Sequence, residues 1–371
     1  MSEFNTEKST ELEKAKITYI DGSTEELASD YIFESYSFHK RQNEIASIIF
    51  PGSIPKLRIF GLYDCDNLKS IVISKGVKEI EGWSLSGMQN LESISLPESL
   101  TDIGELAFML STGLKHIDLP KNLSKIGDMA FANCKNLPEV TLPENLSYLG
   151  ECAFEGCEKL TDITIPDSVA EISGNPFVGC NEIKIKISPE NKNFAVIDNN
   201  IYSKDQKKLV AYTPKPGITS FVIPKDVTSI GNSAFRSCNK LESITIPESV
   251  TEIGKCAFSF CDSIKGIQLP NISKINDHTF CRCEGIESIA VPTSVTEIGR
   301  SAFLGCKSLK SITLPAKLTS IGNEAFDECE SLTDVYFNGS KKKWEKIHIE
   351  NKNDALKNAK IHFKTLFGYT K

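Results

Sequence analysis

The chain repeats one sequence pattern at a nearly fixed spacing. The stretch that begins at Ile244, ITIPESVTEIGKCAFSFC, is found again in similar form at Ile163 and Ile312. We mark each copy by the residue that follows its two alternating apolar residues, as Pro247 follows Ile244 and Ile246. The markers are Pro51, Ser74, Pro97, Pro120, Pro143, Pro166, Ser188, Pro224, Pro247, Pro270, Pro292, Pro315 and Asn338.

Successive markers are 23 residues apart, except for two steps of 22 and one step of 36 between Ser188 and Pro224. A fixed period of this length excludes two or three independent globules. It predicts one solenoid in which each coil packs only on its neighbours.

The interior of a coil can be read from the copy around Ile244. Ile244 and Ile246 alternate with polar residues, which predicts a strand with one buried face, and Pro247 lacks the N–H that would continue the ladder. Gly254 stands where we expect a sharp turn that favours a left-handed conformation. The short segment after this glycine, NSAF at 232–235 in the preceding copy, predicts one capped helical turn whose Ala and Phe point inward.

Nine of the twelve cysteines recur at one repeat position, which predicts a buried column of reduced thiols. They are Cys65, Cys134, Cys157, Cys180, Cys238, Cys261, Cys283, Cys306 and Cys329. Neighbouring Cβ atoms should be about 5 Å apart instead of the about 3.8 Å that a disulfide needs. Cys152, Cys256 and Cys281 lie off this column, and we expect Cys152 and Cys256, which share one position, to react faster.

The recurring pattern LxxIxLPxxLxxIGxxAFxxC resembles the BspA-like, or Treponema-type, leucine-rich repeat over roughly residues 45 to 340. The resemblance implies an α/β-type leucine-rich repeat solenoid, a right-handed superhelix of about 12 to 13 coils of about 23 residues. Its parallel strands would line the concave face, with short helical turns or 3-10 elements opposite.

The same reading divides the chain into four parts. We expect a disordered N-terminal tail over 1–15, an N-terminal cap over 16–45, the solenoid over 46–340 and a C-terminal cap over 341–371. A longer hairpin-containing unit should occupy about 189–223, where the spacing of the markers is widest. The resemblance implies both this unit and the C-terminal cap.

Composition and motifs argue against several functions. The net charge of −7 disfavours nucleic acid as a partner, and no apolar run is long enough to span a membrane. We find no nucleophile elbow, P-loop, HExxH motif or dinucleotide-binding glycine pattern. We therefore predict no enzymatic activity, no cofactor and no metal site.

The outward strand residues are the candidate binding surface, because the strands should form one continuous face. Most of them are small and uncharged, which is also what a curved parallel sheet tolerates. A polar and acidic cluster on three successive coils is the exception, and we predict it as the binding site: His116, Asp118, Glu139, Thr141, Asp162 and Thr164. Carboxylates placed this way could in principle hold Ca²⁺, but we expect a protein ligand.

Two functions fit such a module, and both rest on protein binding by a monomer. The resemblance implies a surface protein that adheres to matrix proteins or to other cells. The alternative is an intracellular scaffold, favoured by the polar N-terminus without a signal-peptide core and by the expected reduced thiols. The sequence leaves the localisation open.

Overall fold

The computed structural model describes residues 14–27, 41–59, 62, 65–180, 182–365 and 368–369. The chain forms two compact units. Unit 1 runs to Tyr148 and includes Cys157–Leu160, and unit 2 comprises Leu149–Gly156 and the chain from Thr161 onward. Much of the predicted tail and N-terminal cap lies outside the described residues, at positions 1–13 and 28–40.

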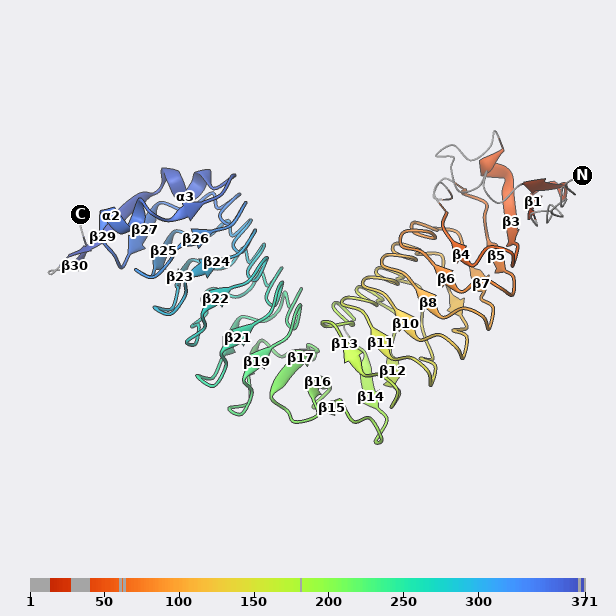
Figure 1. Cartoon of the computed structure of the whole chain (residues 1–371), viewed down its shortest axis with the longest axis horizontal. Coiled ribbons are helices and arrows are strands. Elements are labelled where there is room, and N and C mark those ends of the chain that lie inside the picture. The colour runs from red at the N-terminus through yellow and green to blue at the C-terminus, as the bar shows by residue number, and fades with distance from the viewer. Residues whose placement is uncertain are drawn as a thin grey trace, which may run out of the picture. The chain divides into compact units, whose positions relative to one another are not determined.

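Unit 1 begins with antiparallel pairing and continues as two parallel ladders that pass from coil to coil (Figure 1). The antiparallel part contains β1 (Ala15–Tyr19), β2 (Thr24–Leu27) and the 3-10 turn η1 (Gln42–Glu44). The first ladder contains β3 (Ile45–Phe50), β5 (Ser70–Ile73), β7 (Ser93–Ser95) and β9 (His116–Ile117). The second contains β4 (Lys56–Leu57), β6 (Glu79–Ile80), β8 (Asp102–Ile103) and β10 (Lys125–Ile126), and β11 (Tyr148–Leu149) follows at the end of the unit.

Unit 2 starts with the parallel pair β12 (Asp162–Ile165) and β14 (Lys184–Ile187), with β13 (Glu171–Ile172) between them in sequence. An antiparallel hairpin follows, built from β15 (Phe194–Ile197), β16 (Asn200–Ser203) and β17 (Lys208–Ala211). This hairpin fills the 36-residue step, and β17 joins the parallel ladder of the next coils.

The coils of unit 2 after the hairpin again carry two sets of parallel strands (Figure 1). One set contains β18 (Ser220–Val222), β20 (Ser243–Thr245), β23 (Ser288–Ala290), β25 (Ser311–Leu314), β27 (Asp334–Phe337) and β29 (Lys360–Thr365). The other contains β19 (Ser229–Ile230), β21 (Glu252–Ile253), β22 (Lys274–Ile275), β24 (Glu297–Ile298), β26 (Ser320–Ile321) and β28 (His348–Ile349). The helices α2 (Lys341–Trp344) and α3 (Asp354–Asn358) and the short strand β30 (Gly368–Tyr369) complete the C-terminal end.

The strands form where the sequence alternates apolar and polar residues. In the coil of β20, Ile244 is buried while Ser243 and Thr245 are exposed. Identical positions stand opposite one another in the ladders, so that Ile48 pairs with Ile71, and Ile71 with Ile94. The predicted class, a parallel-strand leucine-rich repeat solenoid, is confirmed.

The turn segments differ from the predicted helical turn. Between residues 70 and 337 no residue of the described chain is in an α-helix or a 3-10 helix. Instead the residues two before and two after the core Phe take left-handed φ angles, as Cys256 (54°) and Phe260 (60°) do around Phe258. Asn175, two residues before Phe177 and followed by Pro176, is an exception.

This conformation lets the turn segment bond to its neighbour. The N–H groups of Cys256, Phe258 and Phe260 donate to carbonyl oxygens of the next coil at 3.1, 2.9 and 2.8 Å. The N–H groups in between donate within their own coil, as Ser259 N–H does to the Cys256 oxygen at 3.0 Å. A helix would direct all its N–H groups along its own axis, so it could not connect the coils in this way.

The repeated glycine serves close packing, not a left-handed turn as we predicted. Gly254 does not have a positive φ. A Cβ atom at Gly254 would lie 2.6 Å from the backbone N of Asn232 and the backbone C of Gly231, which belong to the preceding coil. A side chain there would therefore push two neighbouring coils apart.

A stack of phenylalanine rings fills the centre of the coils. Phe235, Phe258, Phe280, Phe303 and Phe326 are fully buried, and the centroids of successive rings are 5.1, 5.6, 5.4 and 5.2 Å apart. Phe108 and Phe131 make a similar stacked pair at 5.0 Å in unit 1. Phe258, Phe280 and Phe303 are each packed between two other Phe rings, so each of these rings helps to hold three coils together.

The column cysteines are hydrogen-bond donors as well as packing groups. Seven thiols donate to the carbonyl oxygen of the core Phe in the preceding coil, at Sγ–O distances of 2.9 to 3.2 Å. They belong to Cys134, Cys157, Cys180, Cys261, Cys283, Cys306 and Cys329. Where the column has a serine, the Ser111 hydroxyl donates to the Leu85 oxygen in the same way at 2.8 Å.

We expect Phe258→Ala to lower the free energy of unfolding by about 3 to 5 kcal/mol, because it leaves a cavity inside the ring stack. The matched control is Phe260→Ala, two residues away, where the ring is only partly buried and lies under Arg236. Denaturant titration should show the smaller loss for the control. Equal losses would contradict the assignment of Phe258 to the core.

We expect Cys306→Ala to cost about 1 to 3 kcal/mol of unfolding free energy, since it removes both buried volume and a donor to the Phe280 oxygen. Cys306→Ser should cost less, because a hydroxyl already fills this role at Ser111. Thermal and denaturant unfolding of the two variants test this. A serine variant less stable than the alanine variant would show that the hydrogen bond to the Phe280 carbonyl oxygen is not the reason why this position carries a donor side chain.

We expect iodoacetamide to modify Cys256 first in the folded protein, because it is the one cysteine that is not fully buried. Cys152 was also predicted to react faster than the column cysteines, but it is buried and should react slowly. Burial raises the pKa of the Cys134 and Cys329 thiols to about 12, so the reactive thiolate is scarce at neutral pH and increases only as the pH approaches that value. Mass spectrometry after timed labelling gives the order, and early labelling of Cys134 would contradict it.

Candidate binding face

The outward side chains of the unit 1 strands form regular columns. Ser47, Ser70, Ser93 and His116 stand opposite one another in the register of β3, β5, β7 and β9. This column is small and polar until the ladder reaches His116, whereas the other outward column of the same strands begins with the exposed apolar side chains of Ile49 and Val72. The predicted cluster begins where the regular strand ladder ends.

A proline explains why the ladder ends there. The N–H of Glu92 donates to the Lys69 oxygen, and the N–H of Lys115 donates to the Glu92 oxygen, at 2.9 and 3.3 Å. The next residue in this series is Pro138, which has no N–H to donate. Residues 139–142 accordingly form no strand, although the equivalent residues of the three preceding coils do.

An open groove of about 590 Å³ lies at this interruption. Four of the six predicted site residues line it: His116, Asp118, Glu139 and Thr141. All four are exposed. The floor and rim are completed by Ile117, Leu119, Lys121, Leu142, Pro143, Glu144 and Asn145.

The groove is mainly acidic. The carboxylates of Asp118, Glu139 and Glu144 line it together with a single lysine, Lys121. His116 Nε2 lies 3.1 Å from the Asp118 carboxylate, and both side chains are more than half exposed. Asn145 Nδ2 donates to the Lys121 oxygen at 2.9 Å, which fixes one rim to the preceding coil.

The other two predicted residues belong to unit 2. Asp162 and Thr164 are exposed on β12 and stand opposite Lys184 and Lys186 of β14. Lys186 Nζ lies 3.5 Å from the Asp162 carboxylate. Asp162 is therefore partly neutralised by its neighbour.

Unit 2 has a similar interruption on its own strand face. The residues from Lys265 to Leu269 form no strand, and a groove of about 540 Å³ lies beside them, lined by Gln268, Ser288, Ala290 and Thr313 among others. Its polar lining residues are small and uncharged. Glycine at position 266 marks this coil in the sequence, but we did not single it out.

An acid–histidine pair near the C-terminus was also missed by the sequence reading. His362 Nε2 lies 2.7 Å from the Asp334 carboxylate, and the His362 ring stacks on Tyr336 at a centroid distance of 4.7 Å. The hydrogen bond from His362 lowers the pKa of Asp334. These residues come from β27 and β29, and only the register of the strands brings them together.

Within the described ranges, no group of three or more His, Cys, Asp or Glu side chains is arranged to hold a metal ion. In the same ranges, no helix has the length and the apolar character needed to cross a membrane.

Comparison with known families agrees with the repeat. Residues 28–138, 124–214, 208–333 and 273–363 match the family described as "BspA type Leucine rich repeat region (6 copies)". The chain belongs to the BspA-type leucine-rich repeat family. No curated protein gives a significant match.

Three solved structures are similar in fold. A leucine rich cell surface protein from Faecalibacterium prausnitzii is 30% identical, with a TM-score of 0.67 and coverage of 82% of each chain. A leucine-rich repeat protein from Eubacterium ventriosum is 20% identical, with a TM-score of 0.59 and coverage of 78% of this chain and 85% of that one. The pneumococcal vaccine antigen PcpA is 24% identical, with a TM-score of 0.57 and coverage of 86% and 74%.

Proposed function

We propose that this BspA-type protein is a monomeric, non-enzymatic protein-binding module that docks a partner on the strand face of unit 1. The groove formed by His116, Asp118, Glu139 and Thr141 carries the proposal, because it combines exposed polar groups with a rigid strand ladder. A shallow face of this kind gathers binding energy over area and not in a deep pocket.

Adhesion at a cell surface is the role that the comparisons favour. The F. prausnitzii protein, 30% identical over 82% of this chain, is described as a cell surface protein. One observation favours an intracellular scaffold instead: all twelve cysteines are thiols. Immunofluorescence on intact and permeabilised source cells separates the two roles, since only a surface protein is stained without permeabilisation.

The acidic groove predicts partners with basic docking segments. We expect the double variant Asp118→Ser, Glu139→Ser to bind more weakly than the wild type to those members of a panel of immobilised extracellular-matrix proteins that the wild type binds. The salt dependence of binding should also weaken, because the variant lacks two charges that attract a basic partner. Surface plasmon resonance at several salt concentrations measures both effects.

The matched control is Asp226→Ser, Glu248→Ser, which removes the same charge from exposed positions of unit 2 outside the groove. Both double variants should unfold within about 0.5 kcal/mol per site of the wild type, because the substituted side chains lie outside the core. Unchanged affinity and salt dependence in the Asp118/Glu139 variant would show that the groove is not the docking site.

A further inference from the structure

The 36-residue step leaves a gap in the regular stacking of unit 2. The hairpin β15–β17 supplies a strand to the ladder through β17, but the chain then crosses to the next coil by the loop Pro214–Ile218. This loop replaces the segment that carries the column cysteine and the following leucine in an ordinary coil. Lys215 and Ile218 of the loop stand 23 residues before Cys238 and Leu241, and a pocket of about 400 Å³ is lined by this loop and by the turn Ser237–Leu241 of the next coil.

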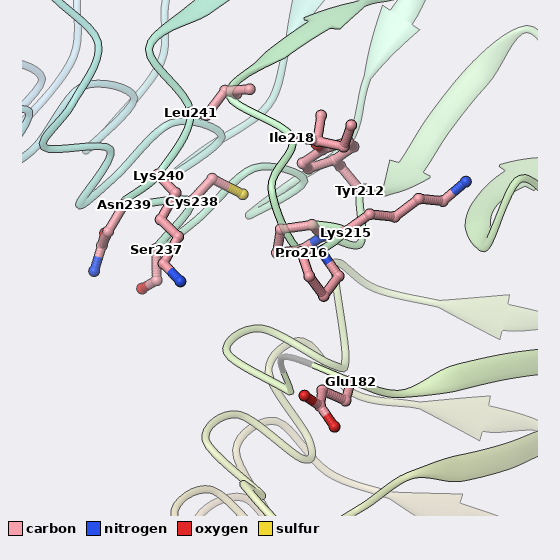
Figure 2. Close-up of a pocket in the computed structure, with 11 residues that line it drawn as sticks. Glu182, Tyr212, Lys215, Pro216, Ile218, Ser237, Cys238, Asn239, Lys240 and Leu241 are labelled. Atoms are coloured by element: carbon pink, nitrogen blue, oxygen red, sulfur yellow. The ribbon is translucent and has the colours of Figure 1, made fainter.

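The pocket is lined by three stretches that are distant in sequence. Figure 2 shows the loop residues Lys215, Pro216 and Ile218, the turn Ser237–Leu241, and Glu182 on a separate stretch of chain. Its volume lies in the usual range for small-molecule sites, about 300 to 1,000 Å³. The pocket belongs entirely to unit 2 and is distinct from the groove in unit 1.

One wall of the pocket is apolar and firmly held. The ring of Tyr212 packs against Phe221 and Phe235 at centroid distances of 4.6 and 5.0 Å, and its backbone N–H donates to the Ala234 oxygen at 2.9 Å. Pro214 and Pro216 restrict the loop, and Ile218 remains 44% exposed at the pocket. An apolar side chain kept this exposed on an ordered wall favours an apolar ligand.

The polar groups of the pocket favour an anion. Lys240, Ser237 and Asn239 offer an ammonium, a hydroxyl and an amide on one turn, and Lys215 adds a second cation from the loop. Among the described residues, neither lysine forms an ion pair, whereas Lys255, Lys274, Lys307 and Lys310 of later coils each pair with a carboxylate of a neighbouring coil. Figure 2 shows Lys215 and Lys240 extending in different directions, so we assign the contact with the anionic group mainly to Lys240. Glu182 is the single acid of the lining.

Cys238 provides a second sign that the regular packing is interrupted here. Its thiol lines the pocket and lies 3.9 Å from the Arg236 oxygen, in place of the close bond to a preceding Phe oxygen that seven other column thiols make. The preceding coil has Tyr212 at the position of the core Phe. The backbone carbonyl oxygen of Tyr212 accepts a hydrogen bond from Asn175 Nδ2 at 3.3 Å.

We propose that this pocket binds a small amphipathic anion, a molecule with an aromatic or aliphatic body and one carboxylate or sulfonate group. The body packs on Tyr212, Pro216 and Ile218, and the anionic group lies at the turn that carries Lys240. This activity is separate from protein docking on the strand face, and either can fail without the other.

The test uses two fluorescent probes of similar body. 8-Anilinonaphthalene-1-sulfonate carries the anion, and N-phenyl-1-naphthylamine lacks it. We expect the sulfonate to bind the folded full-length protein with a stoichiometry of one and more tightly than the neutral probe. Lys240→Gln should weaken the sulfonate about two- to fivefold, as expected for one exposed ion pair, and leave the neutral probe unchanged.

Ile218→Asp should weaken both probes at least about tenfold, because it places a charge on the apolar wall. Lys225→Gln, an exposed lysine outside the pocket, is the matched control and should change neither. Circular dichroism confirms that each variant is folded.

Three results would overturn the proposal. The first is binding of the sulfonate that neither Lys240→Gln nor Ile218→Asp alters. The second is equal affinity for the charged and neutral probes, which would reject an anion site. The third is the absence of a saturable site in the wild-type protein.

Discussion

Each coil of this protein depends on hydrogen bonds that it can form only with its neighbours. Strand N–H groups, turn-segment N–H groups and cysteine thiols all donate to backbone oxygens of the adjacent coil. Because a buried unpaired polar group costs about 1 to 3 kcal/mol, a coil is stable only when another coil stands in register against it. This requirement explains the fixed period, the repeated glycine that permits close approach and the stacked phenylalanine rings.

The same requirement explains where candidate binding sites occur. Pro138 cannot donate to the preceding coil, and the acidic groove lies beside it. Residues 265–269 around Gly266 form no strand and border a second groove, and the hairpin insertion precedes the pocket lined by Ile218 and Lys240. The acidic groove, the second groove and the pocket therefore all lie beside interruptions of the repeat.

Much of the fold followed from the sequence because the pattern recurs so often. The recurring pattern predicted which strand residues face inward, which Phe and Cys positions are buried, and the family. The turn conformation was not, because the segment around Phe258 has no residue that demands a positive φ, and only its bonding to the next coil favours one. For the same reason the role of Gly254 was misread: the contact that excludes a side chain comes from another coil.

The candidate site was predictable only in part. Outward positions such as His116 and Asp118 follow from strand alternation. The groove beside them depends on Pro138, whose lack of an N–H matters only because the equivalent residues of the two preceding coils donate to the coil before. The neutralisation of Asp162 by Lys186 depends on a cross-strand register. The pocket near Tyr212 depends on how the inserted hairpin is accommodated, which no local pattern encodes.

The thiol-to-carbonyl bond also bears on how such a chain can change its length. Seven column thiols present the same donor, and the core Phe of the preceding coil presents the same acceptor, so one of these coils can replace another without altering the joint between them. Duplication or loss of a segment of one full period therefore preserves this joint, wherever along the gene it begins. A step one residue shorter also keeps it, since Cys283 donates to the Phe258 carbonyl oxygen at 2.9 Å across a 22-residue step. The hairpin insertion does not keep it, because Cys238 donates to the Arg236 oxygen of its own coil instead and borders a pocket, so that changes in repeat number alter reach whereas a long insertion creates a new surface for selection.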